Sequence, residues 1–174
     1  TAFLVSLVRD PEGRAQQCPY PAPTCAWLDS VARDRTVRVE RATWLGLLLR
    51  LDAMRRYGLP VTEFFIWHED QELTERLTRH MAGWCVPESV IVHYQDSVFD
   101  PFRHGDKLKF LHGIRNRIAW IKLSAAPFPL KLFRIIKFTV TTLARVVTCK
   151  IPASAVLWLV KGYLFRPQVR MLEY

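Results

Sequence analysis

Residues 64–77 read FFIWHEDQELTERL and decide how this 174-residue chain is interpreted. An aromatic, apolar run ends in three carboxylates, Glu69, Asp70 and Glu72, and a helical pattern of apolar residues then begins. Neighbouring carboxylates repel one another, so a fold that holds them together often uses one of them as a general base on a polar substrate. The alternative is that acidic residues at the start of a helix only complement the helix dipole.

The charge of the chain is divided unevenly. Half of the residues are hydrophobic, which indicates a folded domain with a core. Residues 1–103 contain 12 Arg and 14 Asp or Glu, whereas residues 104–174 contain 13 Lys or Arg and only two acids, Asp106 and Glu173. The net charge of +9 therefore belongs to the C-terminal region, and such a basic block suits the phosphates of a nucleotide, a nucleic acid or a lipid headgroup.

Hydrophobic periodicity and turn residues predict an α/β fold. Strands are expected at residues 2–8, 36–48 and 89–94, an extended piece at 61–67, a loop at 14–26, and helices at 49–57, 69–81, 106–123, 130–149 and 152–164. We divide the chain into residues 1–103, which carry the acidic cluster, and a basic helical region at 104–174.

The expected helix at residues 130–149 is amphipathic, with Lys131, Arg134, Lys137 and Arg145 on its polar side. We favour an interfacial membrane anchor, because this polar side has no acidic residue; the alternative is a helix that packs its apolar side on the domain. The longest apolar run, residues 153–160, is too short to cross a bilayer. The first residues read as a strand inside a domain and lack signal-peptide features, which suggests part of a longer protein.

Several single residues have two interpretations each. Trp67 offers a flat face for a sugar ring, or is an ordinary core residue. His93, at the end of an apolar strand, is a candidate metal ligand or a core histidine. Arg115 suits a diphosphate, or lies on a solvated helix face. Cys18 and Cys25 are seven residues apart and could form a disulfide or bind metal, although reduced thiols are the default expectation.

The order of these motifs resembles the C-terminal half of family-two, inverting glycosyltransferases of the GT-A type, especially bacterial galactofuranosyl- and rhamnosyltransferases. The family pattern Phe-Ile-x-x-(Asp/Glu)-Asp-x-Glu matches residues 65–72, with Arg76 following at the family's spacing. Its later Gly-aromatic turn, Val-Pro-x-Ser and strand ending in His match residues 83–93, and a Tyr-Tyr-x-x-Arg-Asn-like pattern is half kept at 110–116. Residues 42–50 and 57–60 resemble the acceptor-side strand and its Gly-Leu-Pro turn. The resemblance covers roughly residues 1–120 and implies a partial GT-A fold with a C-terminal helical extension.

The resemblance also implies roles for these residues. Asp70 would be the catalytic base, with Glu69 and Glu72 positioning the acceptor or supporting Asp70. His93 would help to hold a divalent metal, Mg or Mn, on the donor diphosphate. The remaining residues implied to bind substrate are Trp67 at the sugar, Arg115 at the leaving group, Asn116 beside it, and Gly46 in the acceptor-side strand.

One departure from the family concerns the donor. The Asp-x-Asp motif of the nucleotide-binding half does not occur in this sequence, so that half would come from a longer protein or a partner chain. The expected function is transfer from a nucleotide-sugar donor to a cell-envelope or lipid-linked glycan, at the cytoplasmic face of a bacterial membrane. The alternative is a non-catalytic module that binds a membrane or another chain. Nucleic acid is not the expected partner, because the basic residues lack the pattern of a nucleic-acid-binding motif.

Overall fold

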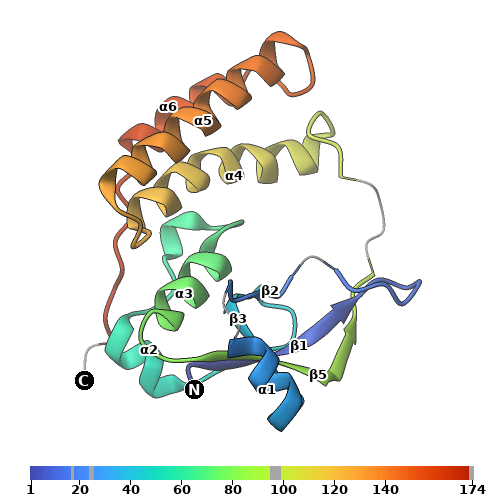
Figure 1. Cartoon of the computed structure of the whole chain (residues 1–174). Coiled ribbons are helices and arrows are strands. Elements are labelled where there is room, and N and C mark those ends of the chain that lie inside the picture. The colour runs from blue at the N-terminus through green and yellow to red at the C-terminus, as the bar shows by residue number, and fades with distance from the viewer. Residues whose placement is uncertain (17, 24–25, 95–98, 173–174) are drawn as a thin grey trace. The chain divides into compact units, whose positions relative to one another are not determined.

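The computed structural model describes residues 1–16, 18–23, 26–94 and 99–172, which form two compact units (Figure 1). The first unit contains Thr1–Pro60, Asp70–Asp96 and Val169–Tyr174. The second contains Val61–Glu69 and Ser97–Gln168. Helices and strands are mixed along the chain, which confirms the predicted α/β class.

A mixed sheet is the centre of the first unit. Its described strands are β1 (Phe3–Arg9), β2 (Tyr20–Pro21), β3 (Val37–Arg41), β4 (Leu47–Leu49) and β5 (Gly83–Val92), in the order β2-β3-β5-β1-β4. Strands β1 and β5 are parallel, whereas the pairs β1–β4, β3–β5 and β2–β3 are antiparallel. The two apolar strands expected from the sequence, β1 and β5, are therefore neighbours at the middle of the sheet.

Three helices complete the first unit: α1 (Ala26–Asp34), α2 (Leu51–Tyr57) and α3 (Glu69–Thr78), whose first residue belongs to the second unit. Leu73 and Leu77 of α3 and Ala53 of α2 join Phe3 and Val5 of β1 in the hydrophobic core. The sequence predicts α2 and α3 correctly, because apolar residues at helical spacing form the buried side of each.

Three of the sequence predictions for the first 67 residues are wrong in detail. Residues 36–48 form two strands, because the chain leaves β3, passes over the positions of β5 and β1 in the sheet, and returns as β4. Gly46 makes the turn before β4 with a φ of +63°, where a side chain would overlap Ile91 and Ser6. Residues 62–64 form a short 3₁₀ helix, η1 (Thr62–Phe64), and the expected loop at 14–26 contains β2 and the start of α1.

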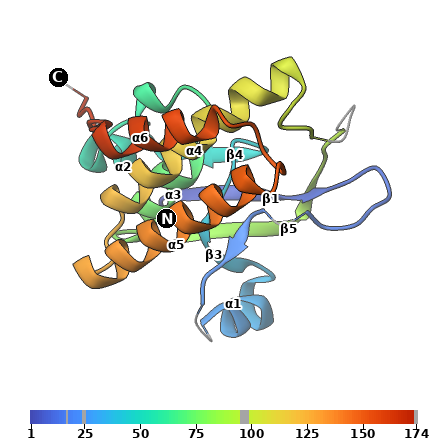
Figure 2. The same cartoon turned by 90° about the horizontal axis from the view of Figure 1, so that it is seen from above.

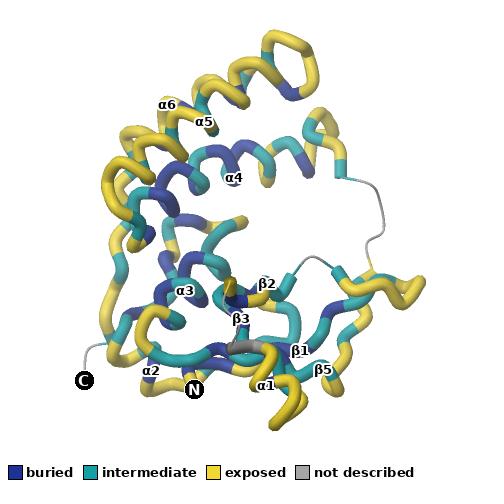
Figure 3. Tube along the Cα trace, in the orientation of Figure 1, coloured by how far each residue is buried: buried dark blue, intermediate teal, exposed yellow. Residues whose placement is uncertain are grey.

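The second unit is built from α4 (His104–Leu123), α5 (Phe128–Val147) and α6 (Ala155–Leu164), close to the three helices expected there. Helix α6 packs along α4, and α5 contacts both (Figures 1 and 2). Their shared core is formed by Leu111, Ile114, Ile118, Ile151, Ala155 and Leu159. Figure 3 shows α4 with many buried residues, and α5 and α6 with mostly exposed ones.

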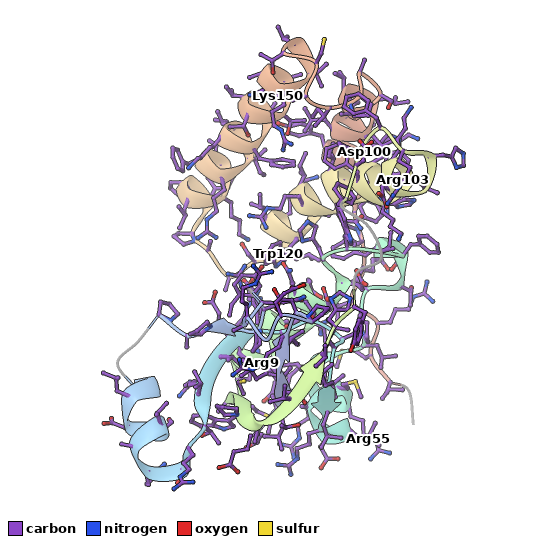
Figure 4. The ribbon with its side chains drawn as sticks, turned by 90° about the vertical axis from the view of Figure 1, so that its right-hand side faces the viewer. Arg9, Arg55, Asp100, Arg103, Trp120 and Lys150 are labelled. Atoms are coloured by element: carbon purple, nitrogen blue, oxygen red, sulfur yellow. The ribbon has the colours of Figure 1, made fainter. Side chains whose placement is uncertain are left out.

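The ends of these helices are held by charged side chains. In the first turn of α4, the Asp106 carboxylate accepts a hydrogen bond from the backbone N–H of Asp100 at 3.1 Å and pairs with Arg103. Figure 4 labels Asp100 and Arg103, which lie just before this helix. These interactions keep the pKa of Asp106 below its usual value. At the C-terminal end of α6, Lys122 Nζ donates to the carbonyls of Gly162 and Tyr163, at 2.9 and 2.6 Å. The carbonyls of a last helical turn have no N–H partner within the helix, so the lysine supplies the missing donor.

Cys18, Cys85 and Cys149 are free thiols. The possible pairing of Cys18 with Cys25 lies outside the described residues, because Cys25 is not among them. Burial raises the pKa of Cys85 to about 11, so this thiol in the sheet stays protonated at neutral pH.

The core of the first unit can be tested with two leucines of opposite exposure. Leu73 is 0% exposed on α3, so we expect Leu73→Ala to lower the free energy of unfolding by about 2–5 kcal/mol. Leu48 is 68% exposed on β4, so Leu48→Ala should cost less than about 1 kcal/mol. Urea unfolding followed by far-UV circular dichroism measures both, and equal losses would contradict this core.

Candidate active site

The backbone just before α3 has an unusual conformation. Phe65, Trp67 and His68 have φ values of 65°, 64° and 74°, in the left-handed region that bulky residues rarely adopt. We call residues 65–68 the aromatic turn. Each such residue costs on the order of 1–3 kcal/mol, and the surrounding structure must therefore hold the turn in place.

Asn116 of α4 provides the main hold on the aromatic turn. This side chain is 0% exposed, and its Nδ2 donates to the carbonyls of Phe64, Ile66 and Trp67 at 2.8, 2.8 and 2.9 Å. The Phe64 carbonyl also accepts from the backbone N–H of Ile66 at 2.7 Å, and the amide supplies a donor to the other two carbonyls, which lie outside helix and strand pairing. The prediction that Asn116 binds substrate stays a prediction; in this structure its amide group contacts the protein.

Arg115 supports the same segment. One of its terminal nitrogens donates to the carbonyls of Glu63 and Phe64 at 2.7 and 3.2 Å, and its Nε donates to Asn116 Oδ1 at 2.9 Å. The guanidinium also lies 4.2 Å from the centre of the Phe165 ring, and burial lowers its pKa. The predicted contact of Arg115 with leaving-group charge is untested, while the observed contacts fix the orientation of Asn116.

Two ring contacts complete the hold on the aromatic turn. Trp67 lies against Gly113 of α4, where any Cβ would overlap its indole, and 5.2 Å from the ring of Phe99. His68 stacks on Trp120 at 5.1 Å. Trp67 keeps 37% of its surface exposed, so one part of this ring remains open to solvent.

Asp70 follows the aromatic turn in sequence and lies in the first turn of α3, partly exposed. Its Oδ1 accepts a hydrogen bond from the backbone N–H of Gln71 at 2.7 Å. Its own carbonyl accepts from Thr74 Oγ1 at 2.7 Å, and Thr74 in turn bonds both backbone groups of Ala42. Burial raises the pKa of the nearby Cys18 thiol, and the negative charge of Asp70 raises it further. The Asp70 side chain is thus partly exposed to solvent, and hydrogen bonds through Thr74 fix the first turn of α3.

Glu72 is placed differently from Asp70. It is 1% exposed and forms a two-point ion pair with Arg76, with distances of 2.8 and 3.0 Å. Arg76 also donates to the carbonyls of Tyr57, Gly58 and Leu59, so the pair joins α3 to the segment after α2. The roles that the resemblance allows for Glu72 stay predictions; in this structure its carboxylate contacts Arg76. Glu69 is partly buried and belongs to the second unit, immediately before Asp70 in the chain.

His93 lies just beyond β5. Its backbone N–H bonds the Arg9 carbonyl at 2.9 Å, and its Nδ1 lies 3.3 Å from Gln16 Oε1. An open hollow of about 670 Å³ lies beside it, lined by Asp10, Pro11, Glu12, Arg14, Ala15, Gln16 and His93. Both carboxylates of this hollow are ion-paired with Arg14, at 2.7 and 2.9 Å.

A metal site is not complete in the described part of the chain. Nowhere in residues 1–16, 18–23, 26–94 and 99–172 do three or more His, Cys, Asp or Glu side chains come together in a way that could hold a metal ion. His93 would supply one ligand, and the other ligands of the implied Mg or Mn would have to come from elsewhere. We therefore derive no step of the chemistry through a metal.

The structure brings the predicted residues together in two groups. Trp67, Glu69, Arg115 and Asn116 belong to the second unit, and Gly46, Asp70, Glu72 and His93 to the first. Gly46 accepts a hydrogen bond from the Ser6 N–H at 3.1 Å, and Ser6 Oγ lies 2.8 Å from Ser89 Oγ. That all eight residues serve one site stays a prediction.

Two residues that hold the site were not selected from the sequence. Arg76 was part of the family pattern, and its spacing of four residues from Glu72 is a recognisable helical ion-pair signal. Gly113 in the middle of a helical pattern is a signal for close packing.

Comparison of the chain with protein-family models, with curated proteins and with solved structures gives no significant match. The case for its function therefore depends on the residues and geometry described above.

Two glycines of α4 test the hold on Trp67. Gly113→Ala places a methyl group in the indole ring, so we expect a loss of about 1–3 kcal/mol in unfolding free energy and a changed near-UV tryptophan signal. Gly105 has no atom within 4 Å of its would-be Cβ, so Gly105→Ala should be neutral or slightly stabilising. Similar effects of the two substitutions would contradict the packing of Trp67 on α4.

The amide of Asn116 can be tested with a substitution of the same shape. Asn116→Asp replaces both N–H donors by oxygen and faces a carboxyl group with three carbonyls, so we expect a loss of about 2–4 kcal/mol. Thermal unfolding measures the loss, and Thr141→Ala on the exposed side of α5 is the control. If Asn116→Asp is as stable as the control, the amide does not hold the aromatic turn.

Proposed function

We propose that this chain is the acceptor-side, base-carrying part of an inverting glycosyltransferase of the GT-A type. The observation that carries the proposal is the partly exposed carboxylate of Asp70 at the start of α3, directly after a strained turn that α4 holds in place. Strained backbone that the surrounding structure maintains is typical of functional sites. The series of motifs in residues 42–116 supports the same family.

The proposed reaction is a single displacement. An Asp70 oxygen takes the proton from an acceptor hydroxyl, and the acceptor oxygen attacks the anomeric carbon of the donor sugar. The bond from that carbon to the nucleoside diphosphate breaks, the diphosphate leaves with the bonding electrons, and the configuration at carbon inverts. Asp70 lies in the first turn of α3, where the helix dipole interacts favourably with negative charge.

The donor would be bound by residues outside this sequence, since the sequence contains no Asp-x-Asp. Strand β4 lies at one end of the described sheet, and Leu48 on it is 68% exposed. An edge strand with exposed apolar residues is suited to pairing with another strand, so we propose it as the place where a donor-binding half or partner chain continues the sheet.

The proposed acceptor is a cell-envelope or lipid-linked glycan at the cytoplasmic face of a bacterial membrane. Trp67, with 37% of its surface exposed, is the proposed stacking residue for a sugar ring. The second candidate function is a non-catalytic module without transferase activity, which is favoured by the absence of Asp-x-Asp in the sequence.

Two acidic residues of α3 distinguish these functions. In the protein as expressed from its own gene, Asp70→Asn should lower transfer from nucleotide sugars to envelope glycan by about 10²–10⁴-fold, with donor binding nearly unchanged. Glu75→Gln, which removes a carboxylate paired with Arg79 on the same helix, should leave the rate near that of the unmodified protein. Radiolabelled sugar incorporation measures both rates. Near-normal turnover of Asp70→Asn would exclude Asp70 as the base, and absence of both donor binding and transfer in the unmodified protein would favour the non-catalytic module.

A further inference from the structure

Helix α5 buries only one of its sides. Ile135, Phe138 and Val146 pack against the core of the second unit, and Thr142 on the same side is 4% exposed. At 100° per residue these four positions fall within an arc of about 80°. Phe138 is thus part of the packing side of the helix.

A second apolar side of α5 faces solvent. Six residues share an arc of about 100°, next to the packing side. They are 39–81% exposed: Leu132, Phe133, Ile136, Val140, Leu143 and Val147. The most apolar side of this helix is therefore left uncovered, as the exposed colouring of α5 in Figure 3 illustrates.

Helix α6 extends this surface. It buries Ala155, Leu159 and Gly162 and leaves its other apolar residues 38–74% exposed: Val156, Leu157, Val160, Tyr163 and Leu164. The Tyr163 hydroxyl lies 2.5 Å from Thr139 Oγ1, so the two helices meet beside their exposed apolar sides. We call these eleven exposed residues the α5–α6 face. A continuous apolar surface of this kind on a folded protein marks an interaction site.

The charges near the α5–α6 face all have one sign. Six exposed cations lie on or between the two helices or just after α6: Arg134, Lys137, Arg145, Lys150, Lys161 and Arg166. On α5, Lys137 lies about 40° from the edge of the exposed apolar arc, whereas Arg134 and Arg145 lie about 100° or more from it. The sequence has no Asp or Glu from residue 107 to residue 172. A partner protein that covers an apolar face usually meets charges of both signs at the rim, whereas uniformly positive charge beside apolar side chains matches an anionic lipid surface.

We propose that the α5–α6 face binds anionic lipid bilayers, with both helices lying in the plane of the interface. The exposed apolar side chains enter the boundary between headgroups and acyl chains, and the cations contact lipid phosphates. No helix in the described ranges is long and apolar enough to cross a membrane, and this face needs none. The inference does not depend on the proposed transferase activity, since it concerns only residues of α5, α6 and their flanks.

Vesicle sedimentation tests the face. The full chain is mixed with vesicles of phosphatidylcholine alone or phosphatidylcholine with phosphatidylglycerol, at low and high salt. We expect binding to the anionic vesicles, reduced by salt, because surface charges are screened. The double variant Lys137→Glu with Lys150→Glu should lower the partition coefficient by on the order of 10²-fold or more, given about 1 kcal/mol per basic residue near the surface.

The apolar contribution needs its own variant. Ile136→Ser with Val140→Ser removes two side chains that are 52% and 59% exposed, so folding should be retained, and the partition coefficient should fall by about tenfold or more. Leu28→Ser and Arg55→Glu, at exposed positions of the first unit, are the matched controls and should bind like the unmodified chain.

Several outcomes would overturn the proposal. These are absence of binding to anionic vesicles at low salt, unchanged binding of the serine variant, and equally weakened binding of the controls. Competition by soluble glycerol phosphate at equal phosphate concentration would show a phosphate site and not a lipid surface. Dimerisation in lipid-free buffer that Ile136→Ser with Val140→Ser abolishes, seen by analytical ultracentrifugation, would assign the face to a second copy of the chain.

Discussion

The hydrogen bonds of one buried amide support the most unusual part of this structure. Asn116 donates to three carbonyls of a turn in which three bulky residues have left-handed conformations. Without these bonds the carbonyls of Ile66 and Trp67 would lose the N–H donor that this side chain supplies, which is costly for buried acceptors. The conformation of the aromatic turn, which precedes Asp70 in the sequence, depends on this arrangement.

A buried ion pair holds α3 within the first unit. The buried pair of Glu72 and Arg76 joins α3 to the carbonyls after α2, and the arginine is fully used by a carboxylate and three backbone oxygens. A buried ion pair of this kind adds little net stability but strongly penalises any arrangement that separates its members. It therefore defines where α3 lies on the sheet of the first unit. Asp70, two residues before Glu72, remains partly exposed on a helix that this pair and the hydrogen bonds between Thr74 and Ala42 attach to the first unit.

The helices of the second unit differ in how completely they are covered. Helix α4 contributes Leu111, Ile114 and Ile118 to the core, while α5 and α6 each bury one narrow side. A soluble domain rarely leaves two neighbouring helices with apolar residues open to water unless another surface covers them. The charged residues around these helices are all positive, so the covering surface should be negatively charged. This is the basis of the lipid-binding proposal.

The sequence by itself determined the α/β class, the helices α2 to α6, the central strands β1 and β5, and the position of Asp70 at a helix start. These follow from hydrophobic periodicity, helix-ending glycines and prolines, and acidic residues in a first turn, all of which act within a few residues. Only the tertiary structure decided the break between β3 and β4, the left-handed aromatic turn, the internal role of Asn116, and which apolar side of α5 is buried. Each of these depends on partners far away in sequence: Asn116 lies about fifty residues from the carbonyls that it binds, and the strand break depends on two other strands of the sheet. Local patterns do not contain such partners, because a side chain's contacts are set by the elements that pack around it after the chain has folded.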